Sequence, residues 1–194
     1  MKREGWFTYT PWEWERTKEV VVFAIDDKVS NAKPSVIEEL RVLLGEFSIP
    51  LDVIDGNLKH NEDLQEIQAL LRGSTRNARI DYEQFERALR NVRDKGRLPY
   101  GVVILIDKNR YEFYDSPSQR GRAIYGIGVS DGLVILRHAH KESVRHEFGH
   151  MLGLPHHDPP KSGCIMNWQC NTPTFCDECK RRIERMWQDE IREE

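Results

Sequence analysis

Two kinds of hydrophobic pattern alternate along the first two thirds of the chain. Continuous apolar runs at residues 18–25 and 101–106 are typical of strands buried on both faces of a sheet. Apolar positions spaced three and four apart at residues 35–47, 64–71 and 82–92 predict amphipathic helices between these strands, of which the last two are either separate helices or one broken helix. This alternation of strands and helices predicts an α/β domain with a mixed sheet and backing helices.

Shorter segments complete the predicted sheet. Residues 51–54 are expected to form a strand that ends at an Asp-Gly turn. Residues 123–129 and 133–137 are expected to form two strands, because the Ser-Asp-Gly at 130–132 suits a tight hairpin. Residues 111–122 have the composition of a loop.

Two further helices are predicted in the last third of the chain. Residues 141–152 have a buried side formed by Val144, Phe148, Met151 and Leu152. Residues 177–191 have apolar residues on one face and charges elsewhere, and they are expected to form the C-terminal helix.

Length and composition indicate a globular protein with one core. The chain has 194 residues, of which 39% are hydrophobic and 31% are charged, so it fits a single domain with a heavily charged surface. A net charge of −3 argues against a general nucleic-acid binder, which is usually basic. We expect a monomer.

Several observations favour a cytoplasmic location. No apolar run approaches the ~20 residues that span a membrane. The basic start of the chain is not followed by the apolar core of a signal peptide. All four cysteines lie between residues 164 and 179, a clustering that favours metal binding over disulfides in a reducing compartment.

The segment HEFGHMLGLPH at residues 146–156 contains the strongest chemical signal in the sequence. His146 and His150 lie four apart on a predicted helix, so both imidazoles can reach one metal ion. Gly153 can adopt the positive φ that ends a helix, and the turn can bring His156 to the same ion. Three protein ligands leave a fourth position for water, as in a catalytic zinc site.

Glu147 is the candidate catalytic residue. It follows the first histidine directly, where its carboxylate can act as general base without binding the metal. A zinc ion lowers the pKa of its bound water to about 7 and polarises a carbonyl group, so the expected reaction is hydrolysis of a peptide or amide bond.

The four cysteines indicate a second metal site. Cys164, Cys170, Cys176 and Cys179 offer four thiols within sixteen residues, which is enough for a closed structural zinc site. The same residues could instead be free cysteines in the core.

The motifs together resemble those of a known family. The HExxHxxGxxH pattern at 146–156, followed by Cys164-Ile165-Met166 as a candidate Met-turn, is similar to the metzincin clan of zinc peptidases. The C-x-x-C at residues 176–179 makes the archaemetzincin family the closest match within that clan. The resemblance implies a zinc metalloprotease with one catalytic and one structural zinc, acting on a peptide or protein substrate.

The resemblance also implies a fold. Residues 1–194 would form a single metzincin-like peptidase domain with a mixed twisted sheet, an active-site helix, a Met-turn and a C-terminal helix. The sheet and its backing helices would occupy residues 1–145, and the zinc motif, Met-turn and cysteine cluster would follow in 146–194. Residues 123–129 would be an antiparallel edge strand that aligns an extended substrate.

Two details of the resemblance concern single residues. Met166 would be an apolar support beneath the ligands rather than a participant in the reaction. The family usually has a cysteine directly after the third histidine, where this chain has His157. The fourth ligand of the second zinc is therefore either His157 or Cys170, and the affinity of thiolates for zinc favours Cys170.

Other functions remain open from the sequence. A zinc-stabilised binding or adaptor protein would use the cysteine cluster and the basic residues 180–182 to dock a partner. An amidase of narrow specificity would keep the same chemistry. His138 and His140 could contact substrate or cap the next helix, and Asp158 could hydrogen-bond a metal-bound imidazole, but the sequence assigns none of these roles.

Overall fold

The structure is a computed structural model of the whole chain. Apart from residues 69 and 87, the helices expected at 64–71 and 82–92 lie outside the residues that it describes. The described residues are 19–24, 27–56, 69, 75–76, 79–81, 87, 101–107, 112–114, 126–129, 132–167 and 172–191.

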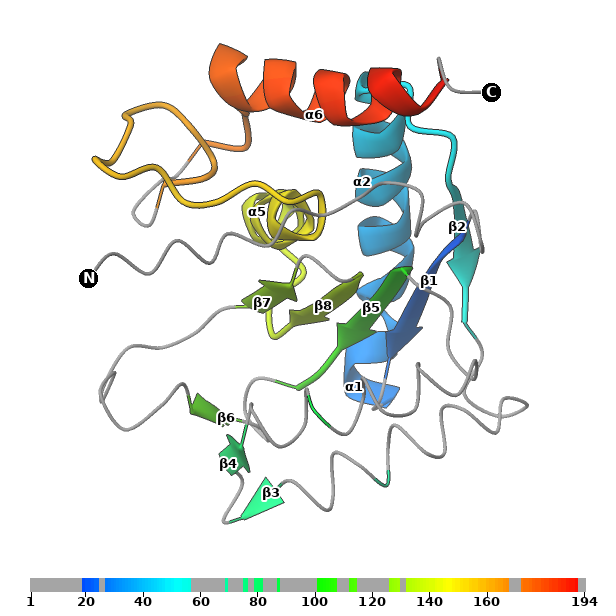
Figure 1. Cartoon of the computed structure of the whole chain (residues 1–194). Coiled ribbons are helices and arrows are strands. Elements are labelled where there is room, and N and C mark those ends of the chain that lie inside the picture. The colour runs from blue at the N-terminus through cyan, green and yellow to red at the C-terminus, as the bar shows by residue number, and fades with distance from the viewer. Residues whose placement is uncertain are drawn as a thin grey trace.

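The main sheet has five strands in the order β2-β1-β5-β8-β7 (Figure 1). The first four strands are parallel to one another, and β7 pairs antiparallel with β8 at the edge of the sheet. The mixed sheet and the hairpin predicted from the sequence are therefore confirmed. The strands are β1 (Glu19–Ala24), β2 (Asp52–Asp55), β5 (Gly101–Leu105), β7 (Gly126–Val129) and β8 (Leu133–Leu136).

Among the described residues, the helices α1, α2, α5 and α6 accompany the sheet. α2 (Lys33–Glu46) has Pro34 in its first turn, where proline is tolerated because it lacks only a donor that the first turn does not use. α5 (Lys141–Met151) packs against α2, β7 and β8, and α6 (Asp177–Ile191) is the C-terminal helix. The short helix α1 (Asp27–Ser30) was not expected from the sequence.

The core lies between the sheet and the helices. Alternate strand residues such as Val20, Val103 and Val134 face α2 and α5, because side chains of a strand point to opposite faces in turn. The helices bring Leu40 and Phe148 to the same core, and both are almost fully buried. This packing fixes α5, and with it the histidine motif, over the edge of the sheet formed by β8 and β7.

One sequence prediction was wrong. Residues 111–122 were expected to form a loop, but β6 (Glu112–Tyr114) is a strand that pairs parallel with β4 (Arg79–Asp81). β4 also pairs antiparallel with β3 (Thr75–Arg76), which completes a second, three-stranded sheet. The partner of β6 lies far away in sequence, so its backbone hydrogen bonds outweigh the loop composition of the neighbouring residues.

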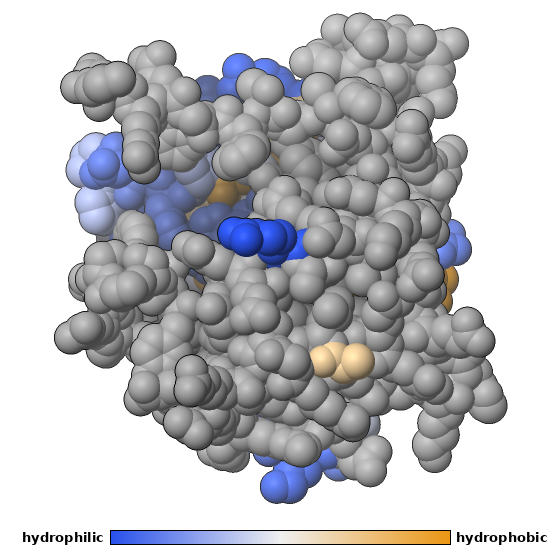
Figure 2. Space-filling view, turned by 60° about the horizontal axis from the view of Figure 1, so that its bottom comes forward, coloured by the Kyte–Doolittle hydropathy of each residue, from blue (hydrophilic) through white to orange (hydrophobic). Residues whose placement is uncertain are grey.

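The surface of the described residues is mainly polar. Their only exposed large hydrophobic residues are Val42 and Ile54. Figure 2 shows mostly hydrophilic side chains where described residues reach that face, with one hydrophobic residue set back in the hollow at the upper left and others at the surface. None of the described helices has both the length and the hydrophobicity to cross a membrane.

Two candidate metal centres

Three histidines converge as the sequence predicted, and His146, His150 and His156 are called the histidine site below. His146 and His150 project from one face of α5, and their Nε2 atoms lie 3.2 Å apart. Gly153 has a φ of 77°, which reverses the chain after the helix. The Nε2 atom of His156 then lies 3.1 Å from each of the other two.

Backbone carbonyls orient two of these imidazoles. His146 Nδ1 donates a hydrogen bond to the carbonyl oxygen of Ile165 at 2.7 Å, and His150 Nδ1 donates to that of Leu154 at 2.8 Å. A neutral imidazole with its proton on Nδ1 has a lone pair on Nε2. The lone pairs of His146 and His150 therefore point at a common position, an arrangement that repels unless a cation lies between them.

The histidine site favours neutral imidazoles. Burial lowers the pKa of His146. Burial, together with the charges of His146 and His156, lowers the pKa of His150 to about 3. Burial and the charge of His146 lower the pKa of His156 to about 4. Near neutral pH the three rings are therefore neutral, which is the form that binds metals.

The spacing of the nitrogens fits a tetrahedral ion. Zn–N distances of about 2.0–2.1 Å would place two nitrogens on one tetrahedral zinc about 3.3–3.4 Å apart. The observed separations of 3.1 and 3.2 Å are close to that value. The three residues form a group that could hold a metal ion, and they supply three of four tetrahedral donors.

The surroundings of the histidine site come from α5 and from residues 164–166. Glu147, next to His146 on the helix, is buried, with 7% of its surface exposed. Met166 is fully buried against Gly149, where an added Cβ atom would lie 2.5 Å from the Met166 sulfur. Glycine at position 149 therefore allows the methionine to pack beneath the helix between the two histidines, as a structural support.

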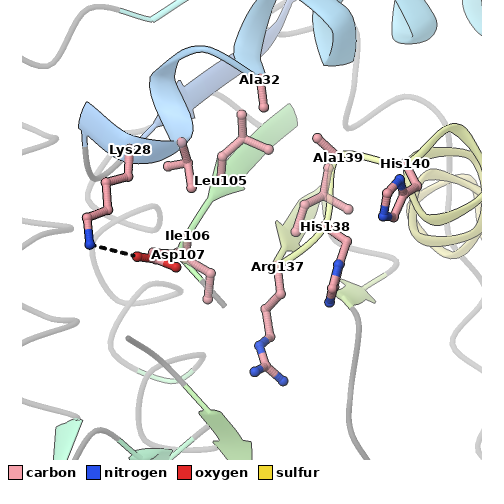
Figure 3. A pocket seen from close by; sticks show the side chains of 11 residues that line it. Lys28, Ala32, Leu105, Ile106, Asp107, Arg137, His138, Ala139 and His140 are labelled. Carbon is pink, nitrogen blue, oxygen red and sulfur yellow. Dashed lines mark ion pairs between the residues drawn. The ribbon is translucent and has the colours of Figure 1, made fainter. Parts of the chain in front are cut away.

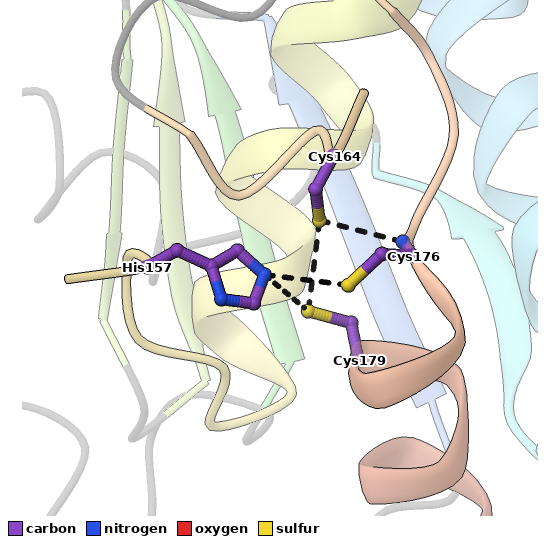
Figure 4. A group of neighbouring side chains, drawn as sticks. All are labelled: His157, Cys164, Cys176 and Cys179. Carbon is purple, nitrogen blue, oxygen red and sulfur yellow. Dashed lines mark hydrogen bonds between the residues drawn. The ribbon is translucent and has the colours of Figure 1, made fainter. Parts of the chain in front are cut away.

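Cys164, Cys176, Cys179 and His157 form a second group, called the cysteine site below (Figure 4). The sulfur atoms of Cys164 and Cys179 lie 3.7 Å apart. His157 Nε2 lies 3.4 Å from the Cys176 sulfur and 3.3 Å from the Cys179 sulfur. A tetrahedral zinc would require about 3.8 Å between two sulfurs and about 3.6 Å between a sulfur and a nitrogen. The group could hold a metal ion with four donors, which closes the site.

The cysteine site also carries the electrostatic features of a cation site. Burial raises the pKa of the Cys164 and Cys179 thiols, and the charge of Cys164 adds to this effect at Cys179. Burial also acts to raise the pKa of Cys176, but hydrogen bonds from the Cys179 backbone and the Cys164 side chain lower it to about 6. Neighbouring thiolates repel one another, so ionising all three requires a positive charge among them.

The fourth position of the cysteine site is filled by His157 among the described residues. The sequence left a choice between His157 and Cys170 and favoured the four cysteines. Cys170 lies outside the described residues. The structure therefore brings together three of the four predicted cysteines and adds a histidine that is adjacent in the chain to His156.

Arg145 is a residue that the sequence analysis missed. Its side chain is only 6% exposed, and it forms ion pairs with Glu39 and Glu46 of α2. It also donates a hydrogen bond to the carbonyl oxygen of Pro173 at 3.2 Å. Burial acts to lower the pKa of Arg145, but the two glutamates outweigh it and raise the pKa. Arg145 lies three residues before Phe148, on the apolar face of the predicted helix. A charged residue on that face was the signal that could have identified Arg145 as buried.

His138 and His140 line a different cavity, of about 240 Å³, at the carboxyl ends of β5 and β8 (Figure 3). The imidazole rings of these two histidines stack, with centroids 5.7 Å apart. On the other side of the cavity, Lys28 and Asp107 form an ion pair at 3.8 Å. His140 is the N-cap residue of α5, without a side-chain hydrogen bond to the helix. Neither histidine belongs to a metal group of the described residues.

Asp158 is exposed. The Nδ1 atoms of His146 and His150 bond to carbonyl oxygens instead of to a carboxylate.

Comparisons of the chain with protein-family models, curated proteins and solved structures find no match.

Proposed function

We propose that the protein is a zinc-dependent peptidase of the metzincin type, similar to the archaemetzincins. The observation that carries this proposal is the convergence of three Nε2 atoms at 3.1–3.2 Å beside a buried glutamate. Three donors leave one position open for water or substrate, as in catalytic zinc sites. The closed set of four donors in the cysteine site suits a structural zinc.

The residues of the histidine site would divide the work of hydrolysis. His146, His150 and His156 would hold the zinc, and their hydrogen bonds to backbone carbonyls would keep the rings in place. A bound zinc would supply a Lewis acid that acidifies water and polarises the scissile carbonyl. The Glu147 carboxylate would accept the proton of the attacking water and pass it to the departing amine.

β7 is the proposed binding surface for the substrate backbone. It is the antiparallel edge of the sheet and packs against α5, which carries the histidines. An edge strand presents unpaired N–H and C=O groups that can pair with an extended peptide. Gly126 and Gly128 on this strand would allow a close approach of that peptide.

Glu147→Gln tests the mechanism because it keeps the shape of the side chain and removes its basicity. We expect cleavage of a peptide library, followed by mass spectrometry, to fall by about 10²–10⁴-fold, the usual contribution of a general base. The metal content should stay at the wild-type value, since Glu147 is not among the grouped donors.

Glu142→Gln is the matched control, because Glu142 lies in the first turn of the same helix and belongs to neither metal group. Its cleavage rate should equal that of the wild type. Equal rates for Glu147→Gln and wild type would reject the mechanism. A metal-loaded wild type that cleaves no peptide would favour the zinc-stabilised binding protein.

A further inference from the structure

The histidine site and the cysteine site use consecutive residues of the chain. His156 Nε2 lies 3.1 Å from His150 Nε2 in the first site. His157 Nε2 lies 3.3 Å from the Cys179 sulfur in the second. The two residues share one planar peptide group, so a metal that fixes His157 also restricts the positions open to His156.

A second connection runs through residues 164–166. Cys164 belongs to the cysteine site, and the carbonyl of the next residue, Ile165, accepts the hydrogen bond from His146. The Met166 carbonyl accepts a hydrogen bond of 3.1 Å from the backbone N–H of His157, and the Asn167 N–H closes the turn on the Cys164 carbonyl at 3.1 Å. Fixing the Cys164 sulfur therefore fixes the carbonyl that orients a histidine of the other site.

A third connection runs through Phe175, the residue before Cys176. Gly149 lies on α5 between His146 and His150, and a Cβ atom added there would lie 3.0 Å from a ring carbon of Phe175. Phe175 is buried, and the N–H of Cys176 donates a hydrogen bond to the Cys164 sulfur at 3.4 Å. The start of α6 and the underside of the active-site helix are thus packed through one aromatic ring.

The segment between α5 and α6 depends on such contacts for its shape. Its described residues, 152–167 and 172–176, contain no helix or strand, so no regular ladder of hydrogen bonds holds them. Ordering such a segment costs conformational entropy, and a metal bound by four of its residues or neighbours offsets that cost. Once the cost is met, His156 is already close to its ligating position.

We propose that the cysteine site is a positioning centre for the histidine site, so that metal bound at the first raises the metal affinity of the second. Thiolates select zinc strongly, so the cysteine site fills first. Linkage makes the effect reciprocal, and coupling factors between two sites are typically about 5–150-fold. The inference rests on the proposed function for its importance, but it concerns metal affinity and not hydrolysis.

Cobalt(II) added to the metal-free protein distinguishes the two sites. Thiolate-to-cobalt charge transfer in the near ultraviolet reports the cysteine site. Both sites give visible ligand-field bands, so the histidine site is followed by the visible absorbance that grows after the charge-transfer band has reached its maximum. In the wild type the charge-transfer band should grow first. In His157→Ala the cobalt affinity of the histidine site should fall by about 5-fold or more.

Two controls identify the cause of that fall. His157→Cys restores a fourth donor and should restore the affinity of the histidine site. Ser162→Ala changes an exposed residue of the same segment that belongs to neither group, and it should bind cobalt as the wild type does.

Unchanged affinity of the histidine site in a folded His157→Ala protein that has lost its charge-transfer band would overturn the proposal. Cys176→Ser serves as the second variant, with the same expected fall. If neither variant folds while the wild type folds with one equivalent of cobalt, the cysteine site orders the segment and the proposal stands.

Coupled sites without peptide cleavage would reject only the peptidase, and cleavage with uncoupled sites would reject only the coupling.

Discussion

The histidine site and the cysteine site are neighbours that present different numbers of donors. The histidine site has three nitrogen donors, two of them on the rigid helix α5 and one after the turn at Gly153. The cysteine site has four donors, three sulfurs and one nitrogen. Cys179 lies at the start of α6, and the other three donor residues lie in irregular segments. An incomplete set of donors on a rigid element suits chemistry, whereas a complete set on irregular segments suits stabilisation.

The largest effect on stability is expected at the cysteine site. Cys176→Ser should remove its metal and lower the free energy of unfolding by about 3–4 kcal/mol, the linkage at ligand concentrations 100–1,000 times the Kd. For a chain of this size that corresponds to a fall in Tm of about 6–16 °C, measurable by calorimetry.

Cys170→Ser is the control that sharpens this result. If His157 completes the cysteine site, the serine variant keeps its metal and its Tm, because four donors are already present. If Cys170→Ser lost its metal while His157→Ala kept it, the fourth donor of the cysteine site would be Cys170, which would contradict this assignment.

The next largest effect is expected at Arg145, which links α5 to α2 and to Pro173. Arg145→Met keeps the volume of the side chain but removes the cation from Glu46 and leaves Glu39 paired with Lys141 at 3.5 Å. We expect the free energy of unfolding to fall by about 2–3 kcal/mol, because removing one member of a buried charged group leaves the others poorly solvated. Chemical denaturation measures the change.

An exposed ion pair provides the comparison for Arg145. Lys161 and Glu178 lie 3.3 Å apart with side chains 46% and 64% exposed. Glu178→Gln removes the charge from this pair and should leave the denaturation midpoint unchanged, because water screens such pairs. Equal losses in the two variants would show that burial of Arg145 does not matter.

The smallest effect is expected at Gly149, under which Met166 and Phe175 pack. Gly149→Ala places a Cβ atom 2.5 Å from the Met166 sulfur, so the methionine must shift. We expect this overpacking to lower the free energy of unfolding by about 1 kcal/mol, which chemical denaturation measures. Gly45→Ala on α2 has no atom within 4 Å of the new Cβ and should instead stabilise the protein by about 0.4–1 kcal/mol.

Local patterns were sufficient for most of the described fold. The buried strands β1 and β5 and the helices α5 and α6 begin and end within two residues of their predicted positions, because apolar runs and helical spacing are local properties. β6 was missed because its strand pairing depends on β4, which lies far away in sequence. α1 is too short to show a helical period.

The two sites differed in how well the sequence predicted them. The histidine site follows from helical spacing and one glycine turn, so the convergence of its three histidines was predicted. The fourth donor of the cysteine site depends on how residues 157–164 fold back, which no local pattern indicates. For the same reason the carbonyl that orients His146 was not foreseen, since Ile165 is 19 residues away.

The metal content of the purified protein, after loading with zinc and removal of unbound ions, tests the central claim of two separate sites most directly. Elemental analysis should find two zinc ions per chain in the wild type and one in His150→Ala, because that variant loses a donor of the histidine site only. One zinc ion per chain in both proteins would contradict the account, since the histidine site would then hold no metal.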